Sequence, residues 1–174
     1  MREPVYTVEV QPGDTPDEAS VRFWEQQRKR SLNGPVVIKG DETPWFKGKM
    51  TSGGSRPYLN PYAFPDTPVQ TWYVFEQKQY THSGKHIHQG GVVLFVLEGR
   101  GYTVIAGERY DWEAGDLIIL PIQPGGVEHQ QFNLDPDRPC RLVAFLYQPF
   151  FMELGNYYTQ TGQPGATKLG GSEK

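Results

Sequence analysis

The sequence has a single cysteine, no long apolar run and no block of basic residues, and each shortage argues against a class of protein. Cys140 alone cannot form an intrachain disulfide, and we expect it to be a small buried hydrophobe rather than a nucleophile. No window approaches the roughly 18 apolar residues of a membrane span, and the N-terminal residues lack the apolar core of a signal peptide. The formal net charge of -3 gives no electrostatic footprint for nucleic acid or an anionic membrane. We therefore expect a cytoplasmic protein without nucleic-acid or membrane partners.

The composition instead favours a β-rich domain. The 174 residues suit one domain, 13% of them are aromatic, and 20 glycines with 15 prolines indicate many turns. From residue 69 onward, short apolar segments are separated by turn residues about every 8 to 12 positions, as in a sandwich or barrel. This spacing predicts strands near residues 69–79, 84–88, 92–98, 101–106, 108–112, 116–121, 127–133 and 139–147.

The first 68 residues predict an arm and a helix that pack on this domain. Residues 3–10 alternate like a strand, and Thr15-Pro16-Asp17-Glu18 is a capping box that predicts a helix from about residue 16 to 32. Phe23 and its neighbours mark the predicted buried side of this helix. Residues 36–39 predict a strand, and the irregular segment 40–68 is too aromatic for a free linker.

At the other end of the chain, residues 149–158 carry enough apolar surface to cap the domain or to form an interface. Residues 159–174 predict a flexible tail. The predicted division is therefore an arm and helix at 1–68, a barrel at 69–150, and a cap segment with a flexible tail at 151–174. Because the arm and the apolar segment need surface to cover, we expect a homodimer.

Three of the four histidines fall in two patterns. His86 and His88 are two residues apart, which puts both imidazoles on one face of an extended strand. His129 follows a Pro-Gly-Gly turn, and it can join the other two if the sheet curls so that both strands face one interior, as in a small barrel. Three neutral imidazoles with open positions suit a catalytic site for Fe, Mn, Ni, Zn or Cu. Ordinary buried polar residues are the alternative interpretation.

These residues resemble the cupin superfamily. Its first motif has a Gly, a His-x-His, a Glu and a later Gly; here Gly99 fixes the register and puts Val92 where the Glu stands. Its second motif matches Pro124, Gly126, His129 and Asn133. The resemblance implies an all-β fold, a single cupin barrel of the double-stranded β-helix or jelly-roll type, here with an N-terminal helix.

The departure at Val92 points to a particular group of cupins. His-x-His, then apolar residues, then Phe-Val-Leu-Glu-Gly resembles gentisate dioxygenase and related ring-cleaving enzymes, which implies a mononuclear Fe(II) bound by His86, His88 and His129. Three neutral ligands leave the charge of the ion uncompensated, so an anionic bidentate substrate is favoured, with O2 as co-substrate. We therefore expect an Fe(II) dioxygenase that cleaves a C–C bond of an oxygenated, aromatic small molecule.

Two other functions stay open from the sequence. A metal cupin isomerase, lyase or decarboxylase would use Zn, Ni or Mn as a Lewis acid. A non-catalytic ligand-binding cupin would follow if the missing Glu marks a degenerate site. Spacing assigns neither the metal nor the substrate.

Strand alternation also predicts the residues around the metal. Gln131 shares the face of His129 and suits hydrogen bonding to a substrate oxygen or superoxide, and His82 is a candidate proton shuttle or else a loop residue. The two faces of strand 69–79 are not distinguished by alternation. A mostly apolar, aromatic substrate pocket is predicted from Val92, Leu94, Val96, Trp72, Tyr102, Phe145 and Tyr147.

Overall fold

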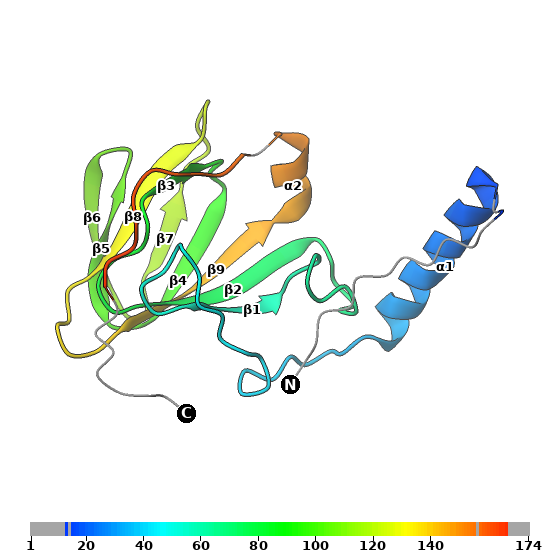
Figure 1. Ribbon diagram of the computed structural model, residues 1–174, viewed down its shortest axis with the longest axis horizontal. Coiled ribbons are helices and arrows are strands. Elements are labelled where there is room, and N and C mark those ends of the chain that lie inside the picture. The colour runs from blue at the N-terminus through cyan, green and yellow to red at the C-terminus, as the bar shows by residue number, and fades with distance from the viewer. Residues whose placement is uncertain (1–12, 14, 156, 167–174) are drawn as a thin grey trace.

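The structure is a computed structural model that describes residues 13, 15–155 and 157–166. Its strands form two five-stranded antiparallel sheets (Figure 1). The first sheet has the order β1-β2-β9-β4-β7 and contains β1 (Ser55–Leu59), β2 (Trp72–Gln79), β9 (Cys140–Tyr147), β4 (Val92–Glu98) and β7 (Leu117–Leu120). The second has the order β10-β3-β8-β5-β6 and contains β10 (Thr159–Gln160), β3 (His86–His88), β8 (Val127–Asn133), β5 (Arg100–Ile105) and β6 (Glu108–Glu113).

The strands predicted from residue 69 onward are all present, within a few residues of the expected spans. In several of them, buried side chains alternate with more exposed ones, because successive side chains of a strand point to opposite sides of the sheet. In β4, for example, Val92, Leu94 and Val96 are buried whereas Phe95 and Leu97 are exposed. The fold is therefore mostly β with two antiparallel sheets, and closure of these sheets into a barrel stays a prediction.

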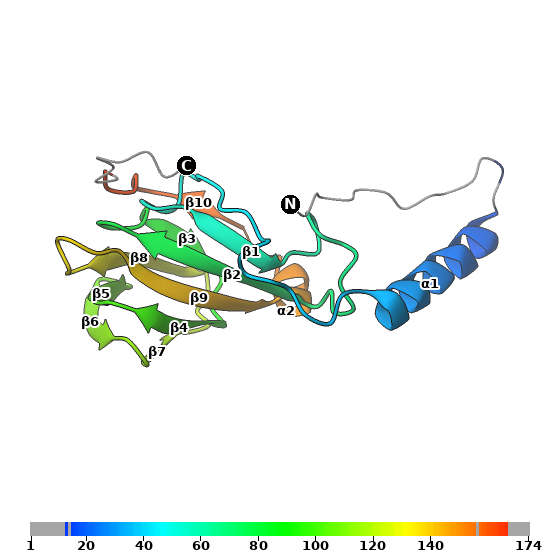
Figure 2. The same ribbon diagram turned by 90° about the horizontal axis from the view of Figure 1, so that it is seen from below.

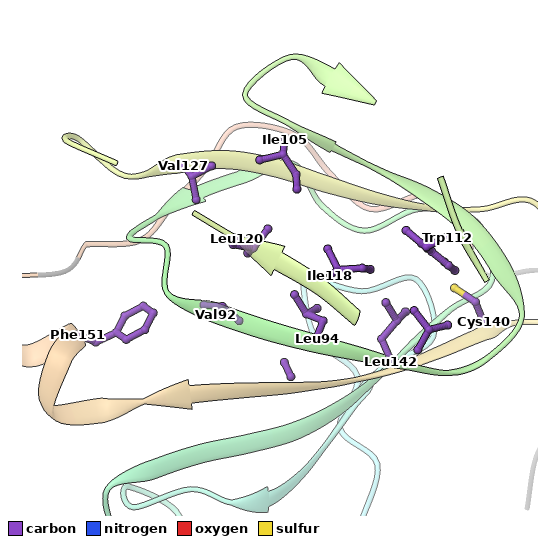
Figure 3. Close-up of a cluster of buried hydrophobic side chains, with 12 residues drawn as sticks. Val92, Leu94, Ile105, Trp112, Ile118, Leu120, Val127, Cys140, Leu142 and Phe151 are labelled. Atoms are coloured by element: carbon purple, nitrogen blue, oxygen red, sulfur yellow. The ribbon is translucent and has the colours of Figure 1, made fainter. Parts of the chain in front are cut away.

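The apolar core lies between the two sheets. Val92, Leu94 and Leu142 of the first sheet face Ile105 and Trp112 of the second, as Figure 3 shows. Burying these side chains removes apolar surface from water, which is the main favourable contribution to folding.

The polar atom of Trp112 and the small residues Cys140 and Gly99 each have a defined place in this core. The indole of Trp112 donates from Nε1 to Thr103 Oγ1 at 2.9 Å, so its one polar atom is satisfied. Cys140 is fully buried, and burial raises the pKa of its thiol to about 12, as expected for a structural rather than a nucleophilic cysteine. Gly99 has a φ of 88°, and a Cβ there would lie 2.8 Å from the Cβ of Cys140, so the turn between β4 and β5 requires glycine.

The N-terminal helix α1 (Pro16–Asn33) stands away from the sheets (Figures 1 and 2). Its predicted capping box is present, with Thr15 N donating to Glu18 Oε2 at 2.9 Å. It has no buried residue, and Phe23 is 41% exposed, so the side expected to be buried is not buried within the described chain. Arg30 ties the helix to the domain by donating to the carbonyl of Pro68 at 2.8 Å.

The predicted division of the chain stays a prediction, and the strand expected at residues 3–10 lies outside the described residues. Neither described helix combines the length and the apolar character that crossing a bilayer would require.

Three short segments differ from the sequence-based expectations. Residues 36–39 do not form a strand, and Val36 is 92% exposed. The irregular segment 40–68 contains β1, which pairs with the edge of β2. Thr159 and Gln160, expected in a flexible tail, form β10 and pair with β3. Pairing with an open sheet edge satisfies backbone groups whatever the side chains, so apolar patterns miss such strands.

The chain turns into the helix α2 (Gln148–Glu153) directly after β9. Phe151 of α2 is buried and projects toward the end of the core cluster at which Val92 lies (Figure 3). The apolar segment after residue 149 therefore covers one end of the space between the sheets.

Candidate metal centre

The three histidines of the two sequence patterns meet on neighbouring strands. β3 pairs antiparallel with β8, and His86 lies directly opposite His129 in the register. His88, two residues along β3, shares the face of His86. The ring centroid of His129 is 4.2 Å from that of His86 and 4.6 Å from that of His88.

One ligand atom from each ring lies within 4.8 Å of the others. The imidazoles therefore converge through ordinary cross-strand pairing, and the curled sheet that the sequence argument invoked is not needed to bring them together.

The backbone fixes which nitrogen of each ring is free. His86 Nδ1 is 2.8 Å from Gly84 O, His88 Nδ1 is 2.7 Å from Gln89 O, and His129 Nδ1 is 3.2 Å from Val127 O. A carbonyl oxygen can only accept, so each Nδ1 carries the proton and donates it. Each Nε2 is therefore left with its lone pair available to a ligand.

The surroundings keep these rings neutral. Burial lowers the pKa of His86 to about 4, with a smaller contribution from the neighbouring His88 ring. Burial also lowers the pKa of His88, and it holds the pKa of His129 well below the usual value, where the two other imidazoles act in the same direction. Neutral imidazole is the form that binds metal ions, so the site does not need to lose protons at neutral pH to accept one.

The centre opens into a cavity of about 520 Å³ between the sheets. This volume is typical of sites for small molecules. The wall combines the three imidazoles with apolar and uncharged polar side chains, among them Tyr73, Phe75, Gln77, Val92, Leu94, Leu120, Gln131, Ala144, Leu146, Gln148, Phe151 and Tyr158. None of its described lining residues is an aspartate or glutamate.

Several predicted site residues do lie in this wall. Val92, at the position of the motif Glu, and Leu94 line the cavity together with the histidines. Gln131 lies two residues beyond His129 on the same face of β8 and is 2% exposed. Its Oε1 is buried and has no hydrogen-bond partner.

Other predicted pocket residues lie elsewhere. Val96 faces inward but belongs to the core and not to the cavity wall. Trp72, Phe145 and Tyr147 are exposed on the outer face of the first sheet, where Trp72 pairs with Tyr147. Tyr102 lies on the outer face of β5 and stacks on Phe132, with ring centroids 4.5 Å apart. For these four aromatic residues the expected pocket position is corrected, because the inward face of each strand is the alternate one.

His82 is also not part of the wall. Its Nδ1 lies 3.0 Å from Ser83 O and 3.1 Å from Gln130 Nε2, and its ring packs on Phe132. This is the position of a loop residue, the alternative reading of the sequence, and a proton-shuttle role for His82 stays a prediction without a contact to the cavity.

The sequence argument missed the inward face of β2 and the residues that brace the histidines. Tyr73, Phe75 and Gln77 line the cavity, and only the pairing of β2 with β9 reveals that their face is the inner one. Ser83 Oγ accepts from Gln131 N at 2.9 Å. Gly84, whose carbonyl orients His86, is itself held by donating from its N–H to Met50 O at 2.8 Å. No periodic signal in the sequence marks these contacts.

Gly90 and the motif residue Asn133 fix the backbone next to the strands that carry the histidines. A Cβ at Gly90 would lie 1.7 Å from Pro121 O, so the chain that follows His88 can pass this close only as glycine. Asn133 Nδ2 donates to Arg138 O at 2.7 Å and to Tyr80 O at 3.1 Å, which fixes the end of β8. Both residues position the strands that carry the histidines and do not line the cavity.

The donor set fits a divalent transition metal. Three imidazoles with fixed tautomers and convergent Nε2 atoms provide nitrogen ligands, and the adjoining cavity leaves room for exchangeable ligands. Without a cation, three lone pairs would face one another in a largely buried space, which is unfavourable. The donor set alone does not choose among iron, manganese, nickel, copper and zinc.

Comparison with known proteins finds a domain match and dioxygenases of similar sequence. Residues 73–146 match the model of the cupin domain. An acireductone dioxygenase from Phaeosphaeria nodorum is 31% identical over 81 residues, which are 44% of this chain and 45% of that protein. A gentisate 1,2-dioxygenase from Haloferax sp is 27% identical over 108 residues, which are 62% of this chain and 28% of that protein. This chain thus covers less than half the length of either relative.

A solved structure shows the same fold. The salicylate 1,2-dioxygenase of Pseudoaminobacter salicylatoxidans, in its adducts with gentisate, superposes with a TM-score of 0.52 at 20% identity, covering 80% of this chain and 36% of that chain. At this identity the likeness concerns the fold. Residues 73–146 thus match a cupin domain, and the three convergent imidazoles within them form a metal motif that resembles those of the three-histidine cupin dioxygenases.

Proposed function

We propose that this protein is a mononuclear non-haem Fe(II) dioxygenase that cleaves a C–C bond of an oxygenated, aromatic small molecule, with both atoms of O2 entering the product. The observation that carries the proposal is the centre itself: three neutral imidazoles at the wall of an apolar cavity whose described lining contains no carboxylate. The dioxygenase relatives support the reaction class. Fe(II) bound at this centre would supply the redox chemistry with O2 that amino-acid side chains lack.

The protein's own residues would bind and orient the substrate. His86, His88 and His129 contribute no negative charge, so an anionic bidentate group on the substrate would supply it. The apolar wall around Val92 and Leu94 would hold a flat ring and exclude water. Gln131, on the same strand face as His129, would orient a substrate oxygen by hydrogen bonding.

The first test is the metal content of protein purified without oxygen and without added metal. We expect iron in the wild type and its loss from a His86→Ala, His129→Ala double variant. His82→Ala is the matched control, because it removes the fourth histidine, which lies outside the cavity wall, and should keep the metal. Wild-type protein that contains no metal and fails to take up added Fe(II) would refute the proposal.

The second test is oxygen uptake by iron-loaded protein with 2-hydroxybenzoates, catechols and enolisable diketones. Stoichiometric consumption of O2 with ring or C–C cleavage supports the dioxygenase. Turnover without oxygen uptake, retained with zinc or nickel, would instead support an isomerase, lyase or decarboxylase that uses the metal as a Lewis acid. A compound that raises thermal stability without being turned over would support a binding function.

We infer that a second copy of the chain covers the outer face of the first sheet. Ile119, Val93 and Phe145 lie side by side across β7, β4 and β9 in the strand register, and Phe95 is exposed next to them. Contiguous exposed apolar surface of this kind marks interfaces. Sedimentation should show a dimer for the wild type and a monomer for Phe145→Glu, and a monomeric wild type at micromolar concentration would contradict this inference.

A further inference from the structure

Three cationic side chains that lie near the cavity turn away from it. Lys85, next to His86, forms an ion pair with Glu128 at 2.6 Å on the outer face of the second sheet. Arg141 of β9 pairs with Glu98 at 2.7 Å on the outer face of the first. Lys78 of β2 lies over an indole ring, 4.6 Å from its centroid. None of these three groups lines the cavity, so none is available to a ligand within it.

The described wall of the cavity accordingly carries almost no charge. The three imidazoles are neutral, and the one charged residue among the described lining is Lys49, which is exposed in the loop before β1. The inner surface is apolar at Phe75, Leu120, Leu146 and Phe151. A charged group removed from water into such a space loses several kcal/mol of hydration unless a countercharge replaces it.

We propose that the site selects its substrate by charge: the two oxygens bound at the histidine centre are the only anionic group that it accepts, and the rest of the substrate is uncharged. This proposal rests on the proposed function, because the chelating group is tolerated through the charge of the metal. A second carboxylate, phosphate or sulfonate on the ligand body would find no cationic partner among the described inner residues.

The wall also favours an uncharged hydrogen-bond donor on the ligand body. Several polar groups of the cavity already have partners: Tyr62 donates to Gln148 Oε1 at 3.0 Å, and Gln79 donates to Gln77 Oε1 at 3.3 Å. Gln131 differs, because its buried Oε1 has none. A hydroxyl or amine of the ligand that donates to this amide would satisfy it, whereas a second anionic group has no proton to donate.

The test compares two ligands of equal shape and different charge. Zn(II)-loaded protein is titrated by calorimetry without oxygen, using 3,4-dihydroxybenzamide and 3,4-dihydroxybenzoate, with catechol as the parent compound. All three present the same pair of hydroxyl groups to the metal, and the first two differ in the charge of the distal group. We expect the amide to bind at least about tenfold more tightly than the acid, since an unpaired buried charge costs more than the 1.4 kcal/mol that this ratio represents.

A variant at Lys49 tests whether the selection by charge arises inside the cavity or at the exposed loop before β1. Lys49→Gln removes the one cationic side chain of the described wall and should leave the ratio of the two affinities within about fivefold, because an exposed charge contributes at most about 1 kcal/mol. A larger change would place the distal group at the loop and overturn the proposal of an uncharged interior. Gln131→Leu should weaken binding of the amide by at least about threefold while leaving catechol less affected.

The outcomes separate this proposal from the proposed function. If the acid binds as tightly as the amide or more tightly, the charge selection is wrong while the metal centre stands. If none of the three compounds binds to protein that holds zinc, chelation at the centre is wrong, and both proposals fail.

Discussion

Replacing Val92 with glutamate places a carboxylate at the position where the cupin motif has one. Val92 is 3% exposed and lines the cavity with the three imidazoles. Its neighbours in the register are Leu120 and Leu146, so nothing cationic lies beside it in the sheet. Without metal the new carboxylate would therefore be buried and unpaired.

The cost of this burial can be worked out. A glutamate in such surroundings stays protonated at pH 7, with its pKa raised by burial above neutrality. In the unfolded chain this glutamate has a pKa of roughly 4.3 and is ionised at pH 7, whereas in the folded chain it keeps its proton. At about 1.4 kcal/mol per pH unit, this difference lowers the free energy of unfolding by about 4 kcal/mol. For a chain of this size the melting temperature should fall by roughly 8 to 16 °C. With a divalent metal, the ionised carboxylate becomes a fourth ligand and much of this loss should be recovered.

Val92→Gln is the matched control, since it has the same shape as glutamate without the charge. Thermal unfolding is measured for both variants with and without Zn(II) or Mn(II), and metal affinity is measured by competition with a chelator. We expect metal to raise the melting temperature of Val92→Glu more than that of Val92→Gln or wild type. Anionic chelating ligands should bind more weakly to metal-loaded Val92→Glu. Equal metal responses of the two variants would refute the view that position 92 faces the metal.

Three further predictions concern stability. Burial lowers the pKa of His86 to about 4, so without metal the unfolded chain binds a proton at this imidazole more tightly than the folded chain does. The contribution of His86 to the free energy of unfolding is therefore complete above about pH 7 and is lost as the pH falls from about 6.5 toward 4. Urea unfolding should show a loss of about 2 kcal/mol at pH 5. Saturating metal should raise the stability over this whole range without reducing the loss, because a metal-bound His86 stays unprotonated in the folded chain. A flat profile would contradict the burial of His86. Leu142→Ala should cost about 3 kcal/mol in the core, whereas Leu117→Ala, on the exposed face of β7, should change the free energy of unfolding little. Arg141→Met should cost about 3 kcal/mol because it removes an ion-pair partner of the fully buried Glu76, and adding Glu76→Gln should recover part of that loss in a double-mutant cycle.

The sequence predicts most of the sheet because the strands after residue 69 are short, apolar and separated by glycine turns. It also predicts the histidine cluster, since the spacing of His86 and His88 fixes their common face. The second motif then places His129 on the partner strand, although pairing in the sheet, and not curvature, brings it opposite His86. These successes rest on local geometry that a few residues determine.

The cavity wall was predicted less well because alternation defines two faces of a strand without saying which one is inner. Trp72 and Tyr73 are adjacent, and both are aromatic, yet only Tyr73 lines the cavity. The choice depends on how β2 pairs with β9 and on what the other sheet covers, and both are tertiary facts. The prediction that one side of α1 is buried failed for the same reason. Apolar residues on one face of a helix indicate that this face is covered, but they do not say by which surface, and the described chain does not bury it.

The arrangement of the centre supports the proposed selection of ligands by charge. Each imidazole is oriented by a backbone carbonyl at most two residues away along the chain, at Gly84, Gln89 and Val127. Carbonyls hold the rings without adding negative charge, whereas a carboxylate in their place would partly neutralise a bound cation. With a divalent metal bound, the centre would therefore keep a positive charge that faces an apolar space. A ligand would then gain most by bringing one compensating anionic group to the metal and nothing charged beyond it.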